Sequence, residues 1–360
     1  MNMNSAGRRG VIERYRSLLP VSETTPVITL LEGSTPLIES PRLSAAVGRD
    51  CRVFLKYEGV NPTGSFKDRG MTVAVSKAKE QAARVLICAS TGNTSAAAAA
   101  YAARAGLQCA VLLPAGKIAL GKLAQAFVYG AKVFGLAGNF DDCLRVVREL
   151  SHEPGIAVVN SINPNRLEGQ KTAAFEIVDE LGDAPAAHLL PVGNAGNISA
   201  YWKGYTEYRQ LGQSTRLPKM IGFQAAGAAP IYYDAVVPHP ETAASAIRIG
   251  NPASWSKARL ALDESKGAID IVTDEEIFAG QRWLAENEGI FVEPASAASV
   301  AGLLRCVSSD RCSRCPLAQI DPGSDIVLTL TGHGLKDVAA LAQGKPIPMP
   351  AEAGAVLAAL

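Results

Sequence analysis

Asn61-Pro62-Thr63-Gly64-Ser65-Phe66-Lys67-Asp68-Arg69-Gly70 is a tight turn that leads into a lysine. The preceding residues 52–57, with the sequence RVFLKY, predict a strand, and the Asn, Pro and Gly after it are typical of a turn. From Met71 to Ala83, apolar residues recur at helical spacing, so Lys67 is expected near the start of a helix. A helix start disfavours a nearby ammonium ion, which helps to keep the amine neutral and nucleophilic.

Lys67 is therefore a candidate for a lysine that forms a Schiff base with pyridoxal phosphate. Such a lysine needs a fixed position, a partly desolvated amine and a neighbouring anion site for the phosphate of the cofactor. Taken alone, Lys67-Asp68-Arg69 is also typical of a solvated charged turn, because charged residues are mostly exposed. The choice between the two depends on loops found further along the chain.

Two such loops follow apolar strands and open helices. Ser90-Thr91-Gly92-Asn93-Thr94-Ser95 follows the strand expected at 85–88. Backbone N–H groups at a helix start bind anions, and the Asn93 amide can hydrogen-bond to a ring oxygen or a carboxylate. Gly193-Asn194-Ala195-Gly196-Asn197 follows the strand expected at 188–192, and its two glycines let the backbone close around a phosphate. Each loop alone also fits an ordinary helix cap or a tight turn.

A third loop, Thr331-Gly332-His333-Gly334-Leu335-Lys336-Asp337, follows the strand expected at 325–330. By itself it could be a glycine-rich turn without a function.

Together these segments resemble the threonine synthases, a branch of the fold-type-II pyridoxal-phosphate enzymes. The resemblance runs from about Leu30 to Asp337 and is carried by the strings NPTGSFKDRGM, STGNTSA, NSINPNRLEGQKT, GNAGN and TGHGLKD. It implies an α/β fold like that of the tryptophan synthase β chain, with two domains, each built on a mostly parallel twisted sheet flanked by helices. It also implies a homodimer, and symmetric dimers are the commonest soluble assembly.

The resemblance assigns the cofactor-binding residues one by one. Lys67 would carry pyridoxal 5′-phosphate, Asn93 would bind its phenolic oxygen, and Gly193, Asn194, Ala195, Gly196 and Asn197 would hold its phosphate. Thr331 would face the pyridine nitrogen. A neutral hydroxyl does not stabilise a protonated ring, which tempers the electron-sink strength of the cofactor and favours elimination and replacement over transamination.

The segment Asn160 to Lys171 decides the substrate. By the resemblance, Arg166 with Asn160 and Ser161 would grip the phosphate of O-phospho-L-homoserine, which reacts with water to give L-threonine and phosphate. The planar guanidinium suits a phosphate because it donates two parallel hydrogen bonds. The remaining residues expected to bind the substrate carry hydroxyl groups: Ser90, Thr91 and Thr94. Arg166 could instead form an ion pair with Glu168 or act as a helix-start charge.

Two alternatives stay open. One is a related dehydratase acting on threonine or serine, or a specialised replacement enzyme. The other is a catalytically silent protein of the same fold that binds a ligand or partner. The joint presence of Lys67, Asn93, the glycine loop and Thr331 argues against the silent protein.

Length, charge and hydropathy limit the classes of partner that the protein could bind. The chain has 360 residues, which usually exceeds one core, and a formal net charge of +1 without a basic stripe for nucleic acid. The alanine run from Ala96 to Ala103 is too short for a membrane span, and residues 1–10 lack the apolar stretch of a signal peptide. We expect a cytoplasmic enzyme with no nucleic-acid or membrane partner.

The seven cysteines form no even disulfide framework. Cys312-Ser313-Arg314-Cys315 has the C-x-x-C spacing, but a zinc site needs about four ligands and no second pair lies near. We expect no metal site.

Expected strands and helices alternate between residues 85 and 158, which is typical of parallel β-α-β units with helices on both faces. The strands are centred near Val85, Ala110, Val133 and Ala157, and the helices near Ala98, Leu123 and Leu144. We expect a smaller inserted domain at 72–158, a large cofactor-binding domain formed by 26–71 and 159–340, and peripheral segments at 1–25 and 341–360. The active site should lie where the strands end at their carboxyl side.

Overall fold

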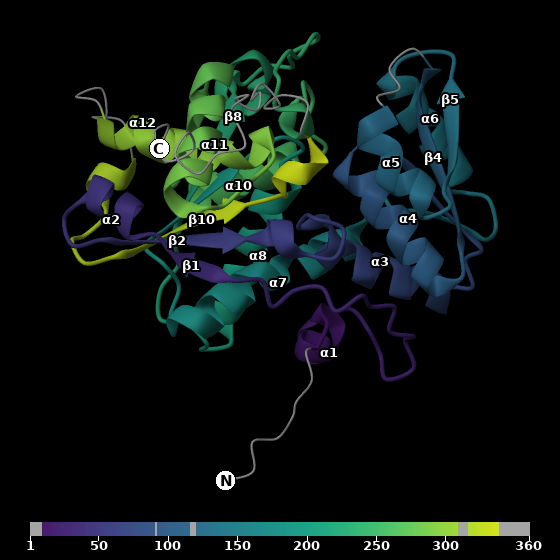
Figure 1. The fold of residues 1–360 in the computed structure, drawn as a ribbon. Coiled ribbons are helices and arrows are strands. Elements are labelled where there is room, and N and C mark those ends of the chain that lie inside the picture. The colour runs from purple at the N-terminus through teal and green to yellow at the C-terminus, as the bar shows by residue number, and fades with distance from the viewer. Residues whose placement is uncertain (1–8, 91, 116–119, 309–315, 338–360) are drawn as a thin grey trace, which may run out of the picture.

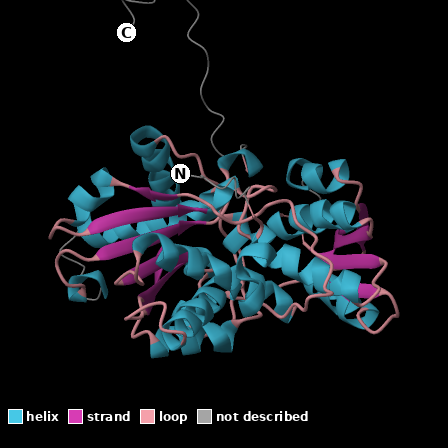
Figure 2. Ribbon diagram, turned by 90° about the horizontal axis from the view of Figure 1, so that it is seen from below, coloured by secondary structure: helices cyan, strands magenta, loops and turns pink. Residues whose placement is uncertain are grey.

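The computed structural model describes residues 9–90, 92–115, 120–308 and 316–337, which form two β-sheets surrounded by helices (Figure 1). The two groups of strands lie towards opposite ends of the molecule, with helices between them (Figure 2). Within the described residues, neighbouring strands are parallel except for β1 and β2. The expected α/β fold with two mostly parallel sheets is confirmed.

The larger sheet has six strands in the order β1-β2-β10-β7-β8-β9. Their bounds are Leu37–Glu39 for β1, Arg52–Tyr57 for β2, Ala187–Pro191 for β7, Lys219–Ala225 for β8, Ala268–Val272 for β9 and Asp325–Leu330 for β10. Every residue of β7 and β10 is buried, as expected for central parallel strands that helices cover on both faces. Side chains alternate between the faces, so Leu189 and Leu190 of β7 enter two different hydrophobic clusters.

Six helices cover the two faces of this sheet. One face packs against α2 (Pro41–Val47), α11 (Asp274–Glu288) and α12 (Pro294–Ser308), and the other against α7 (Pro164–Leu181), α8 (Gly196–Gln210) and α10 (Trp255–Glu264). Helix α11 begins with a capping box in which Thr273 and Glu276 satisfy each other's backbone N–H groups.

The smaller sheet has four strands in the order β5-β4-β3-β6. Its strands are β3 (Val85–Ala89), β4 (Gln108–Pro114), β5 (Lys132–Leu136) and β6 (Ile156–Val158), and its helices are α3 (Lys67–Glu80), α4 (Asn93–Ala105), α5 (Leu120–Val128) and α6 (Phe140–Leu150). All four strands fall inside 72–158. Helix α3 runs across residue 72, so the boundary expected there lies within a helix, and the exact division into domains stays a proposal.

Short elements complete the described fold. They are the helices α1 (Val11–Tyr15) and α9 (Pro230–Tyr233), and the 3₁₀ turns Arg16–Leu18, Glu58–Val60, Ala226–Ala228, Ser245–Ile247, Pro316–Gln319 and Gly334–Lys336. None of the helices within the described ranges is long and apolar enough to cross a membrane.

The segment 9–25 is less peripheral than expected. Val11 and Ile12 of α1 are buried in the cluster beneath α7 and α8, and the Tyr15 hydroxyl donates to Asp179 at 2.8 Å. The Tyr15 ring also meets Phe175 edge to face. A short apolar pair between arginine-rich residues gives no helical period, so the sequence pattern did not indicate this packing. Residues 341–360 and Cys312 to Cys315 lie outside the described residues.

Helices α3 and α7 cross so closely that only glycine fits at the contact. A Cβ atom on Gly70 would lie 2.6 Å from the carbonyl oxygen of Arg166, and one on Gly169 would lie 1.9 Å from that of Arg69. The contact brings the first turns of the two helices together. It therefore places Lys67, at the start of α3, beside Arg166, near the start of α7.

Candidate active site

The turn before Lys67 is held by its own side chains. Gly64 has φ of +81°, which favours glycine, and its N–H donates to the Asn61 carbonyl at 2.7 Å. Asp68 accepts from the backbone N–H of Thr63 at 2.7 Å and from its hydroxyl at 2.5 Å. Helix α3 begins at Lys67 itself, before the Met71 expected from periodicity. The lysine is thus fixed at a helix start, as the sequence indicated.

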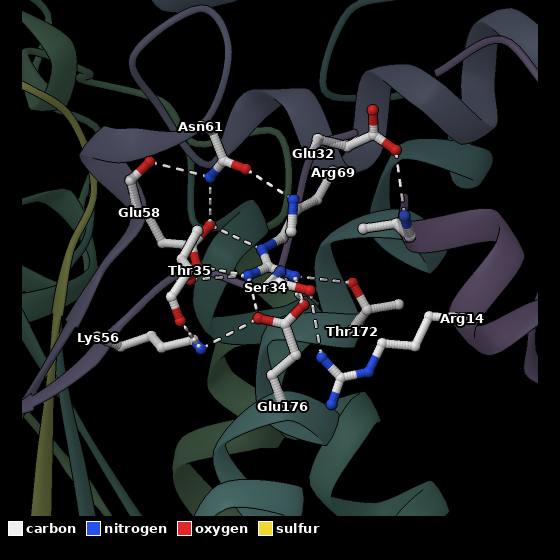
Figure 3. A network of polar contacts seen from close by, with 12 residues as sticks. Arg14, Glu32, Ser34, Thr35, Lys56, Glu58, Asn61, Arg69, Thr172 and Glu176 are labelled. Atoms are coloured by element: carbon white, nitrogen blue, oxygen red, sulfur yellow. Dashed lines mark hydrogen bonds and ion pairs between the residues drawn. The ribbon is translucent and has the colours of Figure 1, made fainter. Parts of the chain in front are cut away.

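Arg69 anchors this turn from below. Its guanidinium is fully buried and bonds to both oxygens of Glu58, at 2.7 and 2.8 Å, and to both oxygens of Glu176, at 2.8 and 2.6 Å (Figure 3). Lys56 donates to Glu176 at 3.0 Å and to the Thr35 carbonyl at 2.7 Å. Burial raises the pKa of Glu176, but the Arg69 and Lys56 charges outweigh burial and hold it well below its usual range. Two buried cations thus face two buried carboxylates.

The solvated reading of Lys67-Asp68-Arg69 is wrong for its last two residues, because Asp68 and Arg69 are fully buried. Their partners explain the difference: the Thr63 backbone and the Glu58 and Glu176 carboxylates replace the water that each charge loses. Sequence reasoning missed Glu58 and Glu176, whose pairing with Arg69 has no local signal in the chain.

The Lys67 amine has the electrostatic setting of a nucleophile. Burial and, to a smaller extent, the nearby Arg166 charge lower the pKa of Lys67 to about 7, against the opposing charge of Glu293. Its Nζ atom lies 4.1 Å from the centre of the Phe66 ring. A large share of the amine is therefore neutral near neutral pH, as a Schiff-base lysine requires.

Arg166 is a buried cation that forms no ion pair with a carboxylate among the described residues. The residue is 1% exposed, its Nη1 atom donates to the Val159 carbonyl at 3.2 Å, and its Nε and Nη2 atoms have no hydrogen-bond partner within the described part of the chain. Burial lowers the pKa of Arg166 to about 10. The ion pair with Glu168 considered from sequence is absent there, because Glu168 pairs with Lys171 at 2.6 Å and with Lys203 at 3.3 Å.

The other residues expected to bind substrate differ in their hydrogen-bond partners and in their exposure. The Asn160 amide pairs with both backbone groups of Ala89 at 3.0 Å, so in this structure it positions the loop that begins at Ser90. The Ser161 hydroxyl accepts from Asn194 at 2.6 Å, and the Ser90 hydroxyl accepts from the Gly92 N–H at 3.2 Å. Thr94 is partly exposed in the first turn of α4, and Thr91 lies outside the described residues.

The loop from Gly193 to Asn197 leads into α8, and neither of its glycines has a positive φ. The left-handed residue is Ala195, with φ of +61°. A Cβ on Gly193 would lie 2.8 Å from the Ile247 Cα, whereas one on Gly196 would come no closer than 3.8 Å to another residue. A side chain at Gly196 would thus make only ordinary van der Waals contacts. The feature that suits a phosphate is the place of the loop at a helix start, where N–H groups bind anions. The Asn194 and Asn197 side chains bind the backbone at Ala253 and Pro191, which holds the loop in shape.

Thr331 lies at the end of β10 and joins the site through its backbone and its side chain. Its carbonyl accepts from the Phe66 N–H at 3.0 Å, directly before Lys67. Its hydroxyl lies 2.9 Å from that of Ser296 on α12. The loops after β2 and β10 thus meet at the carboxyl ends of two neighbouring parallel strands, the edge of the sheet at which the site is expected.

Sequence reasoning also missed Glu293, whose carboxyl group accepts from the Asn93 amide at 2.8 Å. The available signal was an acidic residue directly before Pro294, which starts α12. This residue gives Asn93 a protein partner from the elements around the larger sheet.

These features fit a bound pyridoxal phosphate: a fixed lysine with a lowered pKa, and a loop at a helix start whose N–H groups can bind a phosphate. Residues 28–332 match the model of a family described as pyridoxal-phosphate dependent enzymes. The chain is therefore an enzyme of the fold-type-II pyridoxal-phosphate family, and pyridoxal phosphate is its cofactor. A solved structure agrees with this fold: maize serine racemase superposes with a TM-score of 0.74 at 21% identity, covering 94% of this chain and 97% of that one.

Closer relatives narrow the family. The chain is 60% identical over 329 residues to the threonine synthase of Synechocystis sp., which covers 91% of this chain and 84% of that protein. It is 57% identical over 351 residues to the threonine synthase of Mycobacterium leprae, covering 97% and 95%. Within the pyridoxal-phosphate enzymes, the chain belongs to the threonine synthases.

Proposed function

We propose that this enzyme converts O-phospho-L-homoserine and water into L-threonine and phosphate. The observation that carries the proposal is the Arg166 guanidinium, which is buried beside Lys67 with two nitrogen atoms unpartnered in the described residues. A buried donor without an acceptor costs about 1–3 kcal/mol, and more when it is charged. An anionic substrate group removes this cost, so the free protein is poised to bind one.

A phosphate is the anion that fits best. Its oxygens can accept two parallel hydrogen bonds from one edge of a guanidinium group. Nε and Nη2 of Arg166 lie on such an edge, and both are unpartnered within the described residues. The Ser161 hydroxyl is fixed by Asn194, whose neighbours form the start of α8. Ser161, with Ser90, Thr91 and Thr94, adds hydroxyl donors for the phosphate and the carboxylate of the substrate. Asn160 supports them by holding the backbone of Ala89.

Lys67 is the acid-base residue of the proposed reaction. When bound, pyridoxal phosphate draws electrons from the substrate and stabilises negative charge on its carbon skeleton. The neutral Nζ atom of Lys67 removes the proton from the substrate Cα and passes it on. It then takes a second proton from Cβ, and the electron pair of that C–H bond expels the γ-phosphate. Lys67 afterwards returns one proton to Cγ, which completes the methyl group, and one to Cα. Arg166 keeps the released phosphate in place, where it can accept a proton from the water that adds at Cβ.

The cofactor contacts follow the same assignment. Asn93 donates to the phenolic oxygen, the residues Gly193 to Asn197 hold the cofactor phosphate, and Thr331 faces the pyridine nitrogen. The place of Gly196 at the start of α8 and the position of Thr331 beside the Phe66 backbone support these roles.

The reaction is tested by mixing the purified holoenzyme with O-phospho-L-homoserine. We expect phosphate and threonine to appear in equal amounts. Release of an oxoacid without threonine would favour a dehydratase, and absence of phosphate release would reject the proposal.

Assembly and compartment are part of the same proposal. The enzyme forms a homodimer in the cytoplasm. The described cysteines Cys51, Cys88, Cys109, Cys143 and Cys306 are all free thiols, which fits a reducing compartment. Light scattering at micromolar concentration should give twice the chain mass of 37.7 kDa, and a monomer mass would reject the dimer.

A further inference from the structure

Glu293 lies close enough to Lys67 for the two charges to interact. It directly precedes α12, is 5% exposed, and its Oε1 atom accepts a hydrogen bond from the Asn93 amide nitrogen at 2.8 Å. Asn93 is the first residue of α4, next to the smaller sheet, whereas Glu293 belongs to the elements around the larger sheet. The bond therefore joins two parts of the molecule across the site.

The backbone is shaped to make room for this carboxyl group. A Cβ atom on Gly332 would lie 2.5 Å from Oε1 of Glu293 and 2.7 Å from its Cδ atom. The Glu293 N–H donates to the Gly332 carbonyl at 3.1 Å, and Val292 pairs with His333 in an isolated bridge. Gly332 does not have a positive φ, so the first glycine of TGHG is required for space and not for a turn.

The carboxyl group also limits how the amide of Asn93 can be turned. An oxygen of Glu293 accepts, so the Asn93 nitrogen faces it, and the second N–H of the same nitrogen is directed away from Glu293. Burial raises the pKa of Glu293, while Lys336, the Asn93 bond and Lys67 oppose the rise and Asp337 adds to it. In either protonation state one carboxyl oxygen remains an acceptor.

We propose that Glu293 is a positioning residue that orients the Asn93 amide so that its second N–H donates to the bound cofactor. This inference rests on the proposed contact between Asn93 and the cofactor. It assigns a role to the otherwise unexplained acidic residue before Pro294, and it explains why residue 332 is glycine.

The test measures the affinity of the apoenzyme for pyridoxal phosphate by following the absorbance of the bound cofactor. We expect Asn93→Ala and Glu293→Ala each to weaken binding about tenfold, since each loses one hydrogen bond to a charged or buried group. Glu293→Gln keeps an acceptor oxygen and should lose less than about threefold. The double variant Asn93→Ala/Glu293→Ala should bind as Asn93→Ala does, because Glu293 acts only through Asn93.

Two comparisons exclude a general structural effect. Glu288→Gln changes a carboxylate that binds the Ser40 hydroxyl outside the site, and it should keep full affinity. Melting of the apo forms should differ by less than about 2 °C among the variants. If Glu293→Ala does not fold, Gly332→Ala provides the same test, because its Cβ displaces the carboxyl group.

The outcomes separate this inference from the proposed site. Full affinity of Asn93→Ala would reject the contact between Asn93 and the cofactor, and the inference with it. A lowered cofactor affinity in Asn93→Ala together with an unchanged affinity in Glu293→Ala would reject only the inference. The inference would also be rejected if the losses of cofactor affinity in the two single variants multiplied in the double variant. An affinity of Glu293→Gln as low as that of Glu293→Ala would reject it too, because it would assign the effect to the carboxylate charge and not to the acceptor oxygen.

Discussion

Arg69 and Arg166 are both almost completely buried, and both are the third residue of a helix, in α3 and in α7. Their surroundings differ. Burial works against the Arg69 charge, but Glu176 and Glu58 raise its pKa well above the usual value. Burial lowers the pKa of Arg166 to about 10, with no carboxylate to oppose it.

This difference separates a structural cation from a binding cation. The guanidinium N–H groups of Arg69 donate to Glu58 and Glu176. These bonds stabilise the fold and fix the turn that carries Lys67. Arg166 keeps two nitrogens unfilled in the described structure, so its binding capacity is left for a ligand. The role of a buried arginine is therefore indicated by its hydrogen-bond partners and not by its burial alone.

The largest expected effect comes from Arg69→Met. The change leaves the buried Glu58 and Glu176 carboxylates with too little positive charge, and breaking a buried pair in this way costs about 3–5 kcal/mol. Urea unfolding of the apo form measures the loss. Arg209→Met, which changes an exposed arginine of α8, serves as the control and should lie within about 0.5 kcal/mol of wild type. A stability of Arg69→Met equal to that of the control would show that the network contributes little to the fold.

Arg166→Met should have the opposite profile. Its stability should equal or exceed that of wild type, because an unpaired buried charge is replaced by an apolar chain. Loss of the phosphate clamp should cost about 2–5 kcal/mol in kcat/KM for O-phospho-L-homoserine, or roughly 30-fold or more. Cofactor absorbance should be retained, and slow dehydration of serine, which carries no phosphate, should change far less. An equal loss on both substrates would assign Arg166 to the fold or the cofactor.

Added phosphate tests the binding role of Arg166 in the holoenzyme, where by the proposed assignment the loop from Gly193 to Asn197 is already occupied by the cofactor phosphate. At about ten times its Kd, inorganic phosphate should stabilise the wild-type protein by about 1.4 kcal/mol, which is a rise of roughly 2–4 °C in melting temperature. Arg166→Met should show no rise, and Arg209→Met should behave as wild type. A rise that persists in Arg166→Met would place the anion elsewhere.

The smallest effect concerns the pH at which the cofactor attaches. Attachment to the apoenzyme needs the neutral amine of Lys67, whose pKa is lowered to about 7, so the rate should rise as the pH passes through this value. Removing the Arg166 charge in Arg166→Met takes away one cause of the lowered pKa, so the rise should move to higher pH. Stopped-flow absorbance against pH measures this. A shift to lower pH would contradict the proximity of the two cations.

Sequence patterns alone predicted a large part of this molecule. The strand 52–57, the strand 325–330 and the four strands between residues 85 and 158 follow from short apolar runs between turn residues, because such patterns act over a few neighbours. The loops that bear Lys67, Asn93, Gly193 and Thr331 could be named because each follows the end of an apolar strand. Helix starts were less well predicted: α3 begins at Lys67, since its first turn is polar and has no apolar period.

The sequence by itself determined which loops follow the ends of the apolar strands and which polar residues those loops carry. Only the tertiary structure decided that Arg69 meets Glu58 and Glu176 while Arg166 meets no carboxylate among the described residues, and that Glu293 holds Asn93. Glu176 lies 107 residues from Arg69, and Glu293 lies 200 residues from Asn93. Local patterns fix conformation over a few residues, whereas the partner of a buried charge is set by which distant elements pack against it.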